Sequence, residues 1–179
     1  MVRKSGAGGT VQFAYDAANR LRFSVDATGG LTEQVYDRTG RVTAQRSYAK
    51  AVNLSSLGSA VPTEAQLAGF VATQTLRDDA QDVTVYQVYD GDGRVRLSID
   101  GTGGVVENIY DIAGRRIAEK RYAAAMPLSA AQRDALAAGT ATIASLLAAT
   151  PQSATDSIVR HFYDANDRLV YSVDGTGGA

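Results

Sequence analysis

The chain has 179 residues and a formal net charge of −1 at pH 7, which excludes a basic surface that would attract nucleic acid or an anionic membrane. Although 45% of the residues are hydrophobic, Val, Leu, Ile and Phe make up only 39 of them and Ala contributes 30, so a thin or extended structure is favoured over one thick core. The absence of Cys and the single His exclude disulfides, thiolate zinc sites and sites needing two imidazoles, and no apolar stretch is long enough for a membrane span.

The dipeptide Tyr-Asp recurs at regular spacings along the chain. Its five copies are separated by 21, 53, 21 and 53 residues, which gives a period of 74. The segment Ser24–Gly30 recurs with the same period as Ser98–Gly104 and Ser172–Gly178. We therefore predict one repeat array over residues 1–179. Its modules in chain order are strands over 10–49, a helical insert over 50–82, strands over 83–123, a second helical insert over 124–156 and strands over 157–179.

The strand modules show the alternation of half-buried antiparallel strands. Leu21, Phe23 and Val25 alternate with polar residues, and the pattern recurs over 95–100 and 169–174. Each complete module predicts about four short strands in a meander. The predicted fold class is α+β, mainly β: a repeat array of antiparallel β-hairpins with short helical inserts.

Each Tyr-Asp is followed by two variable positions, then by Gly, Asn or Asp, and then by Arg. Gly, Asn and Asp tolerate a positive φ, which a hairpin built on a type I turn needs at that position. The turn-opening Asp can accept a hydrogen bond from the backbone two residues on. The repeated motif consists of Tyr15, Asp16, Asn19, Arg20, Tyr36, Asp37, Gly40, Arg41, Tyr89, Asp90, Gly93, Arg94, Tyr110, Asp111, Gly114, Arg115, Tyr163, Asp164, Asp167 and Arg168.

The inserts are rich in Ala and contain helix signals. Thr63-Glu64-Ala65-Gln66 and Ser129-Ala130-Ala131-Gln132 both fit a capping box. Leu67, Phe70 and Val71 then form a narrow apolar stripe. The second insert predicts a helix over 130–138 that ends at Gly139, and a short one from about Ile143 to Pro151.

The pattern Tyr-Asp-x-x-Gly-Arg, found at Tyr36–Arg41, Tyr89–Arg94 and Tyr110–Arg115, resembles the YD-repeat or Rhs-repeat family. The similarity is strongest to giant bacterial members with Ala-rich helices between pairs of strand repeats. In that family, arrays of β-hairpins spiral into a hollow shell, which encloses a C-terminal toxic domain in toxin complexes and Rhs toxins. The resemblance implies a non-catalytic structural segment of such a shell, which encloses or displays another domain such as a toxin, in a secreted or cell-surface bacterial protein.

The chain begins just before a strand and stops after a Thr-Gly-Gly turn, so we expect a fragment of a longer array. The expected partners are the remaining repeats of a longer parent chain, an encapsulated toxin domain, and other copies that associate through open strand edges. The alternative function is a cell-surface adhesin or carbohydrate-binding module, in which the repeated tyrosines form a sugar-stacking ladder. Packing between repeats suits their even spacing better.

Three features could suggest other chemistry. Asp90–Gly93 resembles part of a calcium loop, but Asp92 is not repeated in the equivalent turns, which favours plain turn chemistry. Asp100–Gly104 resembles a phosphate loop but opens no helix, which favours a hairpin turn. His161 stands where other repeats carry Phe13 and Gln87, and no nucleophile–base pair accompanies it. We expect no enzyme activity, no catalytic residue, no cofactor and no metal ion.

Overall fold

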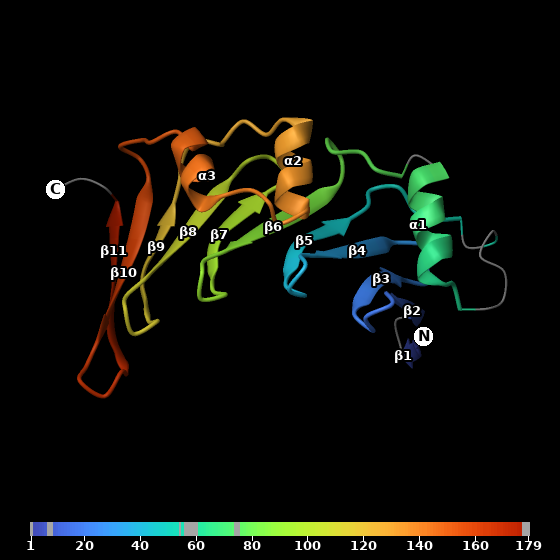
Figure 1. Ribbon diagram of the computed structural model, residues 1–179, viewed down its shortest axis with the longest axis horizontal. Helices are drawn as coiled ribbons and strands as arrows, with labels where there is room; N and C mark the ends of the chain where they lie inside the picture. Colours follow the sequence, from blue (N-terminus) through green and yellow to red (C-terminus); the bar gives the residue numbers. More distant parts are fainter. Residues whose placement is uncertain (1, 7–8, 54, 56–60, 74–75, 177–179) are drawn as a thin grey trace. The chain divides into compact units, whose positions relative to one another are not determined.

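The computed structural model describes residues 2–6, 9–53, 55, 61–73 and 76–176. The chain divides into two compact units, Met1–Val85 and Tyr86–Ala179. Each unit is built from antiparallel strands that pair in chain order, with short helices lying on one side of them (Figure 1). The predicted fold class, mainly β with hairpin repeats and helical inserts, is confirmed.

Among the described residues, five strands and one helix lie wholly within the first unit. In chain order they are β1 (Val2–Gly6), β2 (Gly9–Tyr15), β3 (Leu21–Val25), β4 (Leu31–Tyr36), β5 (Val42–Ser47) and α1 (Glu64–Thr73). Each strand pairs antiparallel with the next. Strand β1 was not expected from the sequence, because its residues show no regular apolar alternation.

The second unit repeats the plan. Its elements are β7 (Val95–Asp100), β8 (Val105–Tyr110), β9 (Arg116–Arg121), α2 (Ala130–Ala137), α3 (Ile143–Ala149), β10 (Ser157–Tyr163) and β11 (Leu169–Thr176), and β6 (Val83–Tyr89) crosses the boundary between the units. Here β7 to β11 also pair antiparallel in order. The four-strand meander predicted for each complete module is therefore confirmed.

The core of the first unit is one layer of side chains between the sheet and its insert. Phe23 and Val25 on β3 are 1% exposed and pack with Leu31, Val52 and the fully buried Leu67 of α1. Burying a Leu of this kind stabilises the fold by roughly 1.5–3 kcal/mol. Since the opposite face of the strands carries partly exposed polar residues, few large apolar side chains are needed, as the composition predicted.

Both predicted capping boxes are formed. The Ser129 hydroxyl accepts a hydrogen bond from the backbone N–H of Gln132, whose side chain accepts one from the backbone N–H of Ser129. Thr63 and Gln66 make the same reciprocal pair before α1. The second helix ends before Gly139, which has a φ of +68°. These caps satisfy backbone groups that would otherwise be unpaired at helix ends.

The buried hydroxyl of Tyr86 in the second unit allows the energetic cost of an unsatisfied polar group to be measured. Its side chain is fully buried, and its hydroxyl has no hydrogen-bond partner among the described residues. An unsatisfied buried hydroxyl costs free energy that a hydrogen atom would not. We expect Tyr86→Phe to leave the free energy of unfolding unchanged or to raise it by up to about 1 kcal/mol, as measured by urea unfolding. The control Tyr48→Phe, which removes a bonded hydroxyl, should destabilise the chain, and equal losses for the two variants would contradict this account.

Candidate functional site

The repeated motif folds into a closed turn in which Asp and Arg bind each other. Asp16 accepts hydrogen bonds through Oδ1 from the backbone N–H groups of Ala18 and Arg20, both at 2.9 Å. Its Oδ2 accepts from Arg20 Nε at 2.8 Å and pairs with Nη2 at 2.7 Å. We call this arrangement the Asp–Arg clasp. The other clasps are Asp37–Arg41, Asp90–Arg94, Asp111–Arg115 and Asp164–Arg168.

The backbone of each clasp has the predicted geometry. Asn19 has a φ of +60°, and its N–H donates to the Asp16 carbonyl at 3.0 Å. The Asp16 N–H donates to the Arg20 carbonyl at 2.9 Å, which closes the hairpin. Gly40, Gly93, Gly114 and Asp167 also have positive φ values at this position. Only Gly, Asn and Asp occupy this position in the five motifs, because these residues tolerate a left-handed backbone best.

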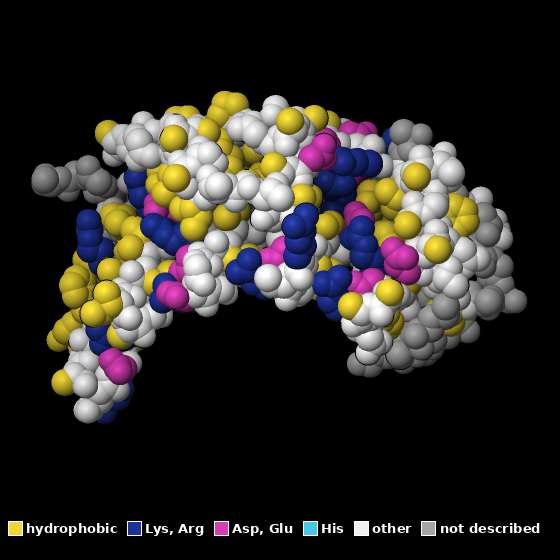
Figure 2. All heavy atoms as spheres, in the orientation of Figure 1, with side chains coloured by type: hydrophobic (Ala, Val, Ile, Leu, Met, Phe, Trp, Pro, Cys, Tyr) yellow, Lys and Arg dark blue, Asp and Glu magenta, His cyan; other side chains and the backbone are white. Residues whose placement is uncertain are grey.

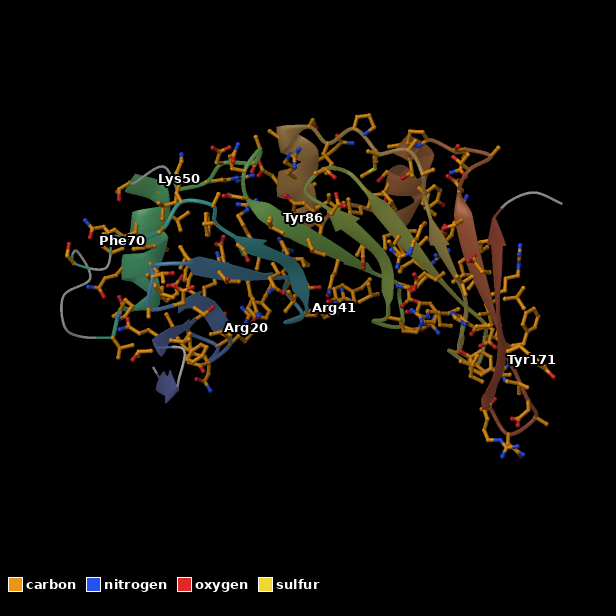
Figure 3. The ribbon with its side chains drawn as sticks, turned by 180° about the vertical axis from the view of Figure 1, so that it is seen from behind. Arg20, Arg41, Lys50, Phe70, Tyr86 and Tyr171 are labelled. Atoms are coloured by element: carbon orange, nitrogen blue, oxygen red, sulfur yellow. The ribbon has the colours of Figure 1, made fainter. Side chains whose placement is uncertain are left out.

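Three of the clasp arginines also lie over the tyrosine of the following motif. The guanidinium of Arg20 lies 4.4 Å from the ring centroid of Tyr36, whose hydroxyl donates to the Leu21 carbonyl at 2.7 Å. A break in strand register between Val35 and Tyr36 accompanies this position of the ring. Figure 3 shows Arg20 at its turn, with Arg41 at the turn of the next motif.

The same link recurs twice in the second unit. Arg94 lies over Tyr110 at 4.7 Å, and the Tyr110 hydroxyl donates to the carbonyl of Val95 at 3.0 Å. Arg115 lies over Tyr163 at 5.3 Å, and that hydroxyl donates to the carbonyl of Arg116 at 2.9 Å. In all three links the tyrosine contacts the arginine of the preceding motif and the carbonyl one residue after it. The tyrosines therefore join one repeat to the next.

The second turn of each repeat fastens the helical insert to the strands. Asp100 Oδ1 accepts from the backbone N–H groups of Thr102 and Gly104, both at 2.9 Å, and from the Thr102 hydroxyl at 2.6 Å. The carbonyl of Gly103 accepts from Met126 N–H at 2.8 Å. Because Asp100 occupies these amides, the loop is a hairpin turn and offers no phosphate cradle through them. The copy at Asp26 is bonded in the same way, while Gly177 and Gly178 of the third copy lie outside the described residues.

A cluster of Arg and Tyr around a buried Glu also repeats, and it was not predicted from the sequence. Arg96 Nη2 lies 2.7 Å from Glu107 Oε1, and the Tyr122 hydroxyl donates to Glu107 Oε2 at 2.6 Å. Burial raises the pKa of Tyr122 to about 12, and the bond to Glu107 and its charge add to this effect. The first repeat has the same cluster in Arg22, Glu33 and Tyr48. Identity of all three residues at a spacing of 74 was the sequence signal that could have revealed it.

A further aspartate ties the end of each insert to the strand before it. Asp156 accepts from the backbone N–H groups of Ala123 at 2.9 Å and Ser153 at 3.3 Å, and it pairs with Lys120 Nζ at 3.1 Å. Asp82 in the first repeat likewise accepts from Ala49 and Asp78. These carboxylates therefore act as connectors within the fold.

The remaining polar candidates have local partners. His161 Nδ1 lies 2.9 Å from the Ser172 hydroxyl on the neighbouring strand. Asp92 is paired with Arg94 at 2.5 Å. Within the described part of the chain, no group of three or more His, Asp or Glu side chains is placed to hold a metal ion. The pairing of Asp92 with Arg94 therefore does not support the hypothesis of a calcium site at Asp90–Gly93.

Removing one clasp carboxylate should destabilise the chain measurably. Asp37 accepts four hydrogen bonds, from Thr39 through its N–H and hydroxyl and from Arg41 through its N–H and Nε. We expect Asp37→Ala to lower the free energy of unfolding by about 1–3 kcal/mol, because charged acceptors satisfy several donors here. Arg38→Ala, an exposed position in the same turn, is the control and should change it by less than about 0.5 kcal/mol. Urea unfolding compares the two, and indistinguishable midpoints would refute the role of the clasp.

The clasps should make folding sensitive to acid. The pKa of Asp16 lies below its ordinary value of 3.8, first because the Arg20 backbone N–H donates to it and then because of the Arg20 side chain. For Asp37, burial alone would raise the pKa, but the bonds from Arg41 and Thr39 outweigh burial and lower it. Since a depressed pKa means that the folded state favours the ionised form, this stabilisation is present above about pH 4 and is lost as pH falls further.

Hydrogen bonds or ion pairs lower the pKa of eight aspartates in the described turns and inserts. They are Asp16, Asp26, Asp37, Asp90, Asp100, Asp111, Asp156 and Asp164. We therefore expect the thermal midpoint, followed by circular dichroism, to be nearly constant from about pH 7 to 5 and to fall steeply below about pH 4. A midpoint that stays constant down to about pH 2.5 would contradict the account.

The comparisons with known proteins found only distant structural similarity. No protein-family model matches the chain, and no curated protein matches it. Solved structures that resemble it include TcdB2-TccC3-Cdc42, with a TM-score of 0.33, 14% identity and 97% of this chain covered, and TcdB2-TccC3 without its hypervariable C-terminal region, with a TM-score of 0.33, 14% identity and 93% covered. The chain spans 10% of the length of each of those chains. None of the described helices is long and apolar enough to cross a membrane.

Proposed function

We propose that the chain is a non-catalytic structural segment of a YD-repeat β-shell, and that the shell encloses or displays another domain, such as a toxin. One observation carries the proposal: the polar groups of the repeated motif bind each other and the next repeat. Asp16, Arg20 and Tyr36 illustrate the pattern, in which carboxylate, guanidinium and hydroxyl all have partners within the fold. A structural segment of a shell needs such contacts within each repeat and between neighbouring repeats.

The same contacts argue against a sugar-stacking ladder. A sugar binds an aromatic platform through the open face of the ring and through free polar groups near it. In Tyr36, Tyr110 and Tyr163 an arginine lies over the ring and the hydroxyl is bonded to a carbonyl. The adhesin alternative would have to displace these contacts.

A glycan array separates the two functions. We expect no saturable binding by the chain. Glycan binding that is lost in Tyr110→Ala, while the circular dichroism spectrum stays unchanged, would support the adhesin function. It would refute the structural role in a shell. Val106→Ala on the same strand serves as the control variant.

Enclosure is tested by protease protection in the full polypeptide that carries this segment. We expect a neighbouring domain to resist cleavage while the array is folded and to become cleavable when several clasp substitutions, Asp37→Ala among them, are combined to unfold it. A neighbouring domain that is cut equally fast in both cases would leave only the displaying role. Hydrolase activity that is lost in His161→Ala would contradict the non-catalytic assignment.

A further inference from the structure

Strands that lead to successive clasps lose their backbone pairing near those turns, and an arginine bridges them. The backbone pairing of β7 with β8 ends at Leu97 and Glu107. Closer to the clasps, the Arg96 guanidinium reaches from β7 and donates to the carbonyl of Asn108 on β8 at 2.6 Å. Arg22 on β3 makes the same kind of bond to β4 in the first unit. Side chains therefore continue the connection where the backbone pairing stops.

The pair of strands β9 and β10 lacks this bridge. Its backbone pairing ends at Arg160 and Ala118. On β9 the counterpart of Arg96 is Ile117, 21 residues later. On β10 the counterpart of Glu107 is Arg160, 53 residues later. Isoleucine has no hydrogen-bonding group, and an arginine in its place would meet the positive charge of Arg160 instead of a glutamate. Other groups therefore connect these two strands near the clasps.

Asp167 provides such a connection. Its Oδ1 lies 2.6 Å from Arg115 Nη1, and this ion pair joins the clasp of one motif to the clasp of the next. Arg115 binds Asp111 of its own clasp through Nε and Nη2, both at 2.7 Å, so Asp167 takes the nitrogen that the clasp does not use. The bond from the Tyr163 hydroxyl to the Arg116 carbonyl lies at the same end of the strands. Figure 2 shows basic and acidic side chains side by side near the turns of the second unit.

At two other positions the left-handed residue of the motif lies beside the arginine of the preceding motif. A Cβ atom on Gly114 would lie 3.3 Å from Arg94 Nη1, and one on Gly40 would lie 3.7 Å from Arg20 Nη1. A side chain at this position of the turn therefore begins next to a guanidinium. Aspartate suits the position because it tolerates the φ of +60° found at Asp167 and carries a carboxylate that a guanidinium binds.

We propose that Asp167 is a positioning residue, which joins the clasp after the insert to the clasp before it and thereby takes the place of the bridging arginine. The covalent connection between β9 and β10 runs through the whole insert, so it restrains the two turns only weakly. The side chains of Arg115 and Asp167 are 34% and 71% exposed, which predicts a contact that opens without unfolding of the unit and that salt weakens. The closure of these two turns therefore depends on ionic strength.

Asp167→Asn separates the charge of this residue from its backbone geometry. Asn19 has the same φ of +60° at the equivalent position, so the turn should keep its shape while the ion pair is lost. At about 50 mM NaCl we expect the NMR order parameters of backbone amides 164–168 to fall from about 0.85 toward about 0.6. Those of the clasp at 90–94 should stay unchanged. Asp174→Asn, which removes the same charge from an exposed position of the same hairpin, is the matched control and should change neither set.

Salt and a double-mutant cycle test whether the effect is electrostatic. About 1 M NaCl should lower the order parameters of the unsubstituted chain to those of Asp167→Asn and leave that variant as it was. In urea unfolding, Arg115→Gln and Asp167→Asn should show a coupling of about 1.4- to fivefold in the folding equilibrium constant at low salt.

Equal order parameters in the unsubstituted chain and in Asp167→Asn at low salt would overturn the proposal. Additive effects of the two substitutions would overturn it too, and so would a variant whose turn salt loosens as much as that of the unsubstituted chain. None of these outcomes bears on the shell function, because the test addresses one contact between two turns.

Discussion

Gly103→Ala is expected to destabilise the chain by about 3 kcal/mol or more. Gly103 has a φ of +95°, and a Cβ atom there would lie 2.1 Å from the carbonyl oxygen of Met126. The backbone of the insert would have to move, and the bond from Met126 N–H to the Gly103 carbonyl would be strained. The measurement is the free energy of unfolding from urea titration followed by circular dichroism.

Gly93→Ala is the matched control for this prediction. Gly93 has a similar φ of +80°, but nothing lies within 4 Å of where its Cβ would be. It should therefore show only the conformational cost, about 1–2 kcal/mol. If both variants lower the free energy of unfolding by the same amount, the close contact with Met126 does not explain the need for glycine at position 103.

Glu107→Ala is the second substitution with a large expected effect, a loss of about 2–3 kcal/mol. Glu107 is 6% exposed, and its removal leaves the Arg96 guanidinium and the Tyr122 hydroxyl without this acceptor. Arg96 still donates to the Asn108 carbonyl at 2.6 Å, and its partial exposure limits the loss.

Glu119→Ala on the neighbouring strand is the control for Glu107→Ala. Its partners Arg116 and Arg121 have largely exposed side chains, so it should cost at most about 1 kcal/mol. The double variant Arg96→Leu, Glu107→Ala should recover part of the loss, since no charge then remains unpaired. A Glu107→Ala loss no larger than that of Glu119→Ala would contradict the buried cluster.

The hairpins and helices were predictable because their sequence patterns are local. Apolar alternation predicted the strands, and the Gly, Asn or Asp before each Arg predicted the turns. The capping boxes at Thr63 and Ser129 predicted where the helices begin. These features depend on residues a few positions apart, where the backbone geometry follows directly from residue type.

The links between repeats were harder to predict. The contact of Arg20 with Tyr36 depends on strand pairing and on the bulge before the tyrosine, which period-2 alternation does not reveal. The burial of Glu33 and Glu107 does not follow from apolar alternation, because a charged residue is buried only where partners such as these arginines and tyrosines bind it. The identity of these residues at a spacing of 74 would have been the better guide.

The polar groups of the repeated motif bind one another and the next repeat, and these contacts hold the array together. Amide hydrogen exchange tests it most directly, at the backbone N–H groups that donate to the clasp carboxylates. These belong to Arg20, Arg41, Arg94, Arg115 and Arg168. The account predicts that, despite their place in surface turns, they exchange as slowly as the amides inside the strands, and exchange as fast as in open loops would contradict it.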